Sequence, residues 1–134
     1  MNIASFDDLL LAAKAQEQPQ QLLFVFAGAE LPTDATTEQE AQFHAGEGGE
    51  LAPRMCVDKL ASALPDFDAL AEEASHAGPP WAIVFAAALS GRNGAPPSAG
   101  DTDRALQKMV DAVKSGRLDG MLPFNRAGLP VQLA

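Results

Sequence analysis

Two uninterrupted apolar runs dominate the pattern of hydrophobic and polar positions along this chain. They cover residues 22–27 and 81–87, and turn-forming residues bound each of them. Runs of this length are too short for a helix, and they are apolar on both faces, which is typical of strands buried in the middle of a sheet. We therefore expect both runs to be central strands.

Apolar residues recur at helical spacing in four other stretches, which predicts helices over residues 5–18, 37–45, 65–78 and 101–114. Ser5 is expected to cap the first helix, and Asp101 or Thr102 the fourth, whereas Pro65 and Asp66 are expected to open the third. The Gly-, Pro- and Ser-rich stretch over residues 90–100 predicts a flexible loop. Shorter strands are expected at residues 54–58, 121–125 and 131–133.

The predicted order is helix, strand, helix, strand, and it occurs twice. A shift of 61 residues, or of 67 in the last part, aligns residues of the same kind in the two occurrences. The clearest matches are Phe6 with Phe67, Phe24 with Phe85, Asp58 with Asn125 and Lys59 with Arg126. We expect pseudo-repeats over residues 5–60 and 66–126. The alternative is that any two strand–helix units share such apolar spacing.

These elements predict a single α/β, or α+β, domain over residues 1–134. A chain of 134 residues can bury a core that needs neither disulfide nor metal. We expect a mixed sheet of four or five strands, covered by four helices. The strand–helix–strand passages are expected to be right-handed parallel crossovers, because a twisted strand that feeds a helix packs back on its sheet mainly in that hand.

The charge balance narrows the possible partners. The chain has 18 Asp and Glu against 9 Lys and Arg, a net charge of −9, which repels nucleic acid and anionic lipid. Its longest apolar runs, residues 22–29 and 81–89, are less than half of the roughly 20 residues that a membrane helix requires. One cysteine cannot form an internal disulfide, and the first residues lack a signal-peptide pattern, so a cytoplasmic location is expected.

Few residues have a pattern that indicates catalysis. Cys56 lies in an expected strand with no histidine obviously placed to activate its thiol, so we expect it to be a buried structural residue. His44 and His76 each lie near a helix C-terminus, where an imidazole interacts favourably with the helix dipole. A zinc site would need three or four ligands. We therefore assign no catalytic residue, metal or cofactor.

Three polar pairs follow the expected strands. They are Asp58 with Lys59, Arg92 with Asn93, and Asn125 with Arg126. Open α/β sheets bind ligands outside the carboxyl ends of their strands. These six residues therefore form a candidate ligand-binding site, facing one cleft between the two halves. The alternative is that they are ordinary solvated loop ends.

Several motifs across nearly the whole chain support a family resemblance. They are LLFVFAGAELP at residues 22–32, MCVDK at 55–59, WAIVF at 81–85, ALSG at 88–91, PFNR at 123–126 and PVQ at 130–132. In these motifs the chain resembles a family of small proteobacterial proteins that are often labelled as ribonucleotide reductase alpha subunits. A true reductase uses a radical thiol and a reducing dithiol inside a far larger barrel, whereas this chain has Cys56 alone. The resemblance therefore identifies a family and implies no activity.

These observations favour a non-catalytic binding or protein-interaction domain, because the sequence contains no assembled nucleophile, metal cluster or cofactor motif. An exposed apolar patch would then mark the surface that meets a protein partner. The alternative is a small enzyme that acts on a polar metabolite bound between the two halves, at the strand carboxyl ends. A homodimer joined through an exposed sheet edge is compatible with either.

Overall fold

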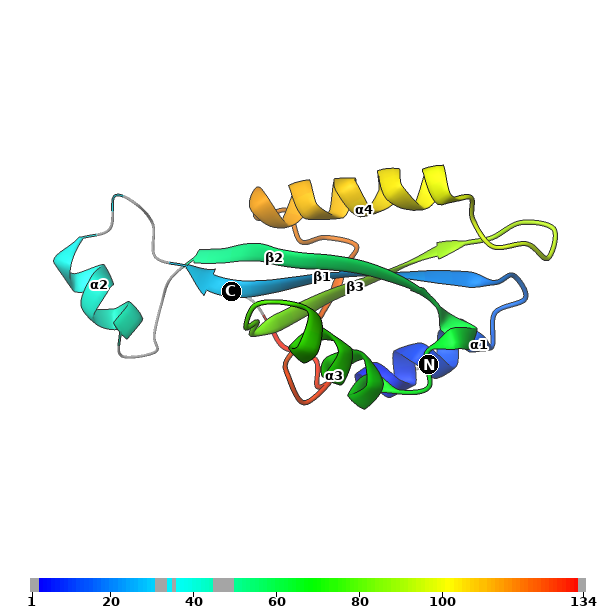
Figure 1. Ribbon diagram of the computed structural model, residues 1–134, viewed down its shortest axis with the longest axis horizontal. Helices are drawn as coiled ribbons and strands as arrows, with labels where there is room; N and C mark the ends of the chain where they lie inside the picture. The colour runs from blue at the N-terminus through cyan, green and yellow to red at the C-terminus, as the bar shows by residue number, and fades with distance from the viewer. Residues whose placement is uncertain (1–2, 31–33, 35, 45–49, 133–134) are drawn as a thin grey trace.

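The computed structural model describes residues 3–30, 34, 36–44 and 50–132 (Figure 1). Its elements, in chain order, are α1 (Phe6–Lys14), β1 (Gln20–Glu30), α2 (Thr37–His44), β2 (Glu50–Leu60), a 3-10 turn (Ala61–Ala63), α3 (Phe67–Ala77), β3 (Ile83–Ser90), α4 (Ala99–Lys114) and β4 (Leu122–Phe124). The predicted order of helix, strand, helix, strand, occurring twice, is confirmed, and so is the mixed helix-and-strand class.

The sheet has four strands in the order β2-β1-β3-β4, and every neighbouring pair is antiparallel. The prediction of a mixed sheet with parallel crossovers was therefore wrong. Figure 1 shows one reason: α2 lies beyond the end of β1 and β2 instead of crossing a face of the sheet. The other reason lies after α4, where Gly116 and Gly120 adopt positive φ angles of 72° and 83°. These residues turn the chain back, so that β4 enters the sheet antiparallel to β3.

Strand β1 is buried on both of its faces. Phe24 and Phe26 pack in the cluster formed with α1 and α3, whereas Leu23 and Val25 pack in the cluster formed with α4. All four side chains are at most 3% exposed. Figure 1 shows α4 on one side of the sheet and α1 with α3 on the other. Together with the buried Phe85 of β3, this confirms that the two apolar runs form the central strands.

An aromatic cluster joins both halves of the chain on the α1 and α3 side of the sheet. The ring of Phe6 lies 5.7 Å from that of Phe24, 5.0 Å from that of Phe67 and 5.4 Å from that of Phe124, measured between centroids. Tilted and edge-on pairs at these distances add stability beyond the area that they bury. Two helices and two strands therefore share one packing centre.

Side-chain caps fix where three helices begin. The Ser5 hydroxyl accepts a hydrogen bond from the Asp8 amide, as predicted. The third helix opens at Asp66, whose carboxylate accepts a hydrogen bond from the Ala69 amide. The fourth helix begins earlier than predicted, because Ser98 is its N-cap and accepts from the amide of Asp101. Neither Asp101 nor Thr102 is the cap.

The strand order is compatible with two related halves. Strands β1 and β2 form one antiparallel pair, β3 and β4 form another, and β1 meets β3 in the centre. The helices differ between the halves, because α4 covers a face of the sheet and α2 does not (Figure 1). Duplication of residues 5–60 in residues 66–126 therefore stays a prediction. Among the described helices, none has the length and apolar character needed to span a membrane.

The aromatic cluster predicts where the fold is most sensitive to truncation. Phe24→Ala should lower the free energy of unfolding by about 3–5 kcal/mol, because it leaves a cavity beneath two helices. Leu11→Ala is the control, since Leu11 is 65% exposed and its loss should change that free energy by no more than about 0.5 kcal/mol. Urea denaturation followed by circular dichroism measures both values, and similar losses for the two variants would contradict the assignment of the core.

Candidate functional site

The antiparallel sheet separates the six residues that were predicted to share one cleft. Lys59 pairs with the start of β1 at Leu22, and the same end of the sheet holds Ser90, the last residue of β3. Strand β4 runs the other way, so Asn125 and Arg126 follow it toward the opposite end. The expected common cleft is therefore not formed. Equivalent strands of the two halves point in opposite directions because β1 and β3 are antiparallel.

Asp58 and Lys59 are both engaged in local interactions on β2. The Asp58 carboxylate accepts a hydrogen bond of 2.6 Å from the side-chain amide of Gln21. The Lys59 ammonium lies 2.8 Å from the carboxylate of Glu73 on α3. These contacts tie β2 to its neighbours, β1 and α3.

Asn125 and Arg126 likewise support the local structure after β4. The Asn125 side-chain oxygen accepts hydrogen bonds from the amides of Ala127 and Leu129, at 2.9 and 3.1 Å, and thereby closes a turn. The Arg126 guanidinium lies 5.2 Å from the centre of the Trp81 ring and donates to the Trp81 carbonyl at 3.2 Å. Such a cation–π contact anchors the turn to the core.

Arg92 and Asn93 belong to a tight hairpin turn within the stretch that was predicted to be a loop. Arg92 and Ala95 exchange backbone hydrogen bonds, each 2.9 Å long, and Asn93 and Gly94 between them have φ angles of 53° and 78°. Two successive positive φ angles define the type I′ turn, for which Asn-Gly is the preferred sequence. The amide of Gly94 also donates to the Gln18 side chain at 2.8 Å. The turn is therefore fixed in place.

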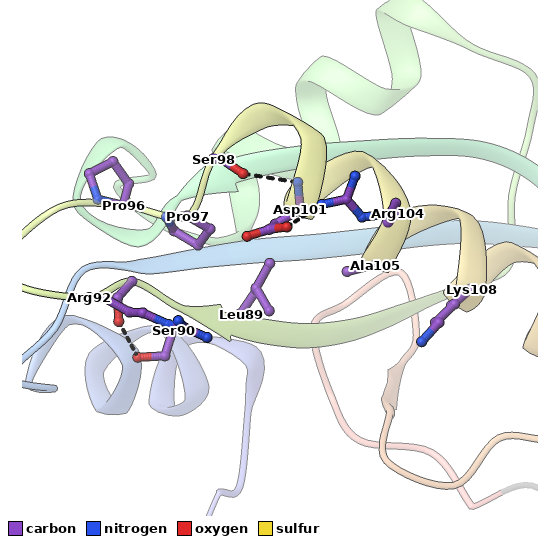
Figure 2. Close-up of a pocket in the computed structure, with 11 residues that line it drawn as sticks. Leu89, Ser90, Arg92, Pro96, Pro97, Ser98, Asp101, Arg104, Ala105 and Lys108 are labelled. Atoms are coloured by element: carbon purple, nitrogen blue, oxygen red, sulfur yellow. Dashed lines mark hydrogen bonds and ion pairs between the residues drawn. The ribbon is translucent and has the colours of Figure 1, made fainter.

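This turn forms one end of a cleft of about 500 Å³ between the end of β3 and the first half of α4. Figure 2 shows α4 above the cleft and β3 below it. The helix contributes residues at the spacing i, i+3, i+4 and i+7, which lie on one helical stripe. They are Asp101, Arg104, Ala105 and Lys108. Leu89, Ser90 and Arg92 line the other wall, and the stretch that contains Pro96 and Pro97 joins the two walls.

The lining of the cleft is positively charged, although the chain as a whole carries a net charge of −9. Arg92, Arg104 and Lys108 line it against the single carboxylate of Asp101. Arg104 forms an ion pair with Asp101. Within the described part of the chain, the side chains of Arg92 and Lys108 have neither an ion pair nor a hydrogen-bond partner. The cleft thus offers two unengaged cations to an anion.

Sequence reasoning found Arg92 and missed the residues that α4 contributes. That helix was predicted, but no binding role was assigned to its polar side chains. One signal was present: Asp101, Ala105 and Lys108 each precede a buried position of α4, at Thr102, Leu106 and Met109. They therefore flank the buried stripe of the helix and lie next to the part of the sheet that the helix covers.

Charged side chains and the hydroxyls of Ser90 and Ser98 provide the polar groups of the cleft. No cysteine or histidine is among its lining residues. Cys56 lies elsewhere, on the edge strand β2, and it is exposed, so the prediction that it is buried was wrong. Among the described residues, no three His, Cys, Asp or Glu side chains gather in a way that could hold a metal ion.

Comparisons of this chain with protein-family models, with curated proteins and with solved structures found no match. The family resemblance noted from the sequence motifs therefore stays a prediction. The function has to be inferred from the geometry and charge of the cleft.

The hairpin turn gives a direct test of the cleft wall. Gly94→Ala should lower the free energy of unfolding by about 1 kcal/mol, because Gly94 has a positive φ, which disfavours any residue with a Cβ. Gly100→Ala, in the first turn of α4, should raise it by up to about 1 kcal/mol, since alanine favours a helix more than glycine does. Urea denaturation distinguishes the two variants, and shifts in the same direction would contradict the turn geometry.

Proposed function

We propose that this protein is a non-catalytic binding domain whose ligand is a small anion held in the cleft between β3 and α4. The observation that carries this proposal is the concentration of charge. Three of the nine Lys and Arg residues of a strongly acidic chain line this one cleft. A volume of about 500 Å³ lies within the range of small-molecule sites.

The charge distribution favours a small anion over a large one. The net positive charge of the cleft acts within about 8–10 Å at physiological salt, whereas the surrounding acidic surface repels an extended polyanion. The N-terminus of α4 lies at the same cleft and adds the partial positive charge of the helix dipole. A small anion can enter this local field, and a nucleic acid would meet the acidic remainder of the surface.

The polar groups in the cleft support binding more than catalysis. The Ser98 hydroxyl caps α4. The Ser90 hydroxyl accepts a hydrogen bond from Gln20 at 3.1 Å and donates one to the Gly91 carbonyl at 3.2 Å. Asp101 is paired with Arg104. Each hydroxyl and carboxylate of the cleft is thus already engaged, which supports the proposal of a binding domain over that of an enzyme acting on a metabolite.

The edge strand β2 gives little support to the alternative of a dimer joined through the sheet. It pairs on one side with β1, and its register shifts opposite Phe26 and Ala27. It also contains Pro53, which has no amide hydrogen. A bulge and a proline are features by which edge strands avoid pairing with other chains. The cleft is therefore the surface on which we base the function.

Removing a cation from the cleft should weaken anion binding. Arg92→Gln or Lys108→Gln should lower the affinity for inorganic phosphate about three- to tenfold, because each variant removes one of the positive charges that attract the anion into the cleft. Lys114→Gln is the matched control, since Lys114 lies in the last turn of the same helix, outside the cleft. Isothermal titration calorimetry measures the affinities. Equal losses in all three variants would indicate a general charge effect and contradict the proposal.

Removing the carboxylate should have the opposite effect. Asp101→Asn should tighten phosphate binding about three- to tenfold, because the change removes a repulsive charge and releases Arg104. Asp111→Asn changes the net charge equally on the same helix, away from the cleft, and should leave the affinity within about twofold. The same titration tests both variants. An unchanged affinity in Asp101→Asn would contradict the assignment of the site.

A further inference from the structure

The two unengaged cations of the cleft lie apart, with apolar side chains between them. Arg92 comes from the turn after β3, and Lys108 comes from α4. Figure 2 shows Leu89 and Ala105 in the space between these two side chains, with Lys108 extending down from the helix. The cleft therefore has a cation toward each end, and between them Leu89 and Ala105 provide apolar surface beside the Asp101 carboxylate, which is paired with Arg104.

The helix sets the length of this cleft. Asp101 and Lys108 are seven residues apart on α4, which corresponds to about 10 Å along the helix axis. Both residues line the cleft, so its lining follows the helix over that distance. We therefore expect a compact ion that contacts the cation at one end of the cleft to leave the cation at the other end without a contact.

On the basis of the proposed function, we infer that the ligand is an elongated dicarboxylate with an apolar middle. Arg92 binds one carboxylate and Lys108 binds the other, while the carbon chain packs against Leu89 and Ala105. One cation at each end matches the single charge of a carboxylate. A phosphate monoester, with nearly two charges, would be only half neutralised there. Arg104 stays paired with Asp101 and is not needed for either contact.

A series of carboxylates that differ in length and in charge tests this inference on the full chain. The probes are malonate, adipate and suberate, each compared by calorimetry with the monocarboxylate of equal chain length: propionate, hexanoate and octanoate. We expect suberate to bind about three- to fivefold more tightly than octanoate, because it makes a second ionic contact. Malonate should gain little over propionate, since it is too short to reach both cations.

Variants of the two cations separate this inference from the proposed function. In Arg92→Gln and in Lys108→Gln, suberate should bind no more tightly than octanoate, whereas Lys114→Gln should keep the full difference. Equal affinities of suberate and octanoate in the unmodified protein, with both lowered in Lys108→Gln, would overturn the inference and leave the proposed function standing. An equal gain for malonate and suberate would also overturn it. If neither these probes nor inorganic phosphate bind, the proposed function itself fails.

Discussion

Burial of β1 on both faces is the constraint on which the rest of this structure depends. A strand whose side chains are all apolar between Leu22 and Ala27 is stable only with a layer of helices on each side. The even-numbered positions require α1 and α3, and the odd-numbered positions require α4. The strand also requires a partner along each edge, which β2 and β3 provide. The positions of the helices follow from these requirements.

The cleft is a consequence of how α4 meets this sheet. Leu106, Met109 and Val113 bury one stripe of the helix against the odd-numbered face of β1, against β2 and against Phe85 of β3. The tight turn at Asn93 and Gly94, followed by Pro96 and Pro97, sets where the chain leaves β3, and the Ser98 cap sets where the helix starts. The neighbouring stripe of α4, which contains Asp101, Arg104, Ala105 and Lys108, therefore faces the end of β3 across the cleft. Its charged side chains form the wall of an open cleft instead of a fully solvated surface.

The sequence predicted a structural feature well where one interaction determines that feature. It predicted much less where several interactions together determine it. The unbroken apolar runs around Phe24 and Phe85 predicted both central strands, because burial on two faces leaves little choice. Strand direction was missed, since it depends on turns at Gly116 and Gly120 that apolar periodicity does not report. That error placed Asn125 and Arg126 at the wrong end of the sheet. Of the six predicted site residues, Arg92 alone lines the cleft. The Asn93-Gly94 pair is a sequence signal from which the hairpin turn could have been predicted. The contribution of Lys108 depends on which side of α4 faces the sheet, and only the packing of the helix determines that side.

The central claim is that an anion binds between β3 and α4, and the most direct measurement is a backbone amide NMR titration of the full chain with adipate. The amides at residues 89–92 and 98–108 should shift together and saturate along one binding curve, because one bound anion sits between these two segments. Lys14 and Lys114 are also exposed cations, but they lie outside the cleft. The chemical shifts of the amides around them should therefore not change. Shifts spread over all cationic surfaces without saturation, or shifts confined to residues far from the cleft, would contradict the account.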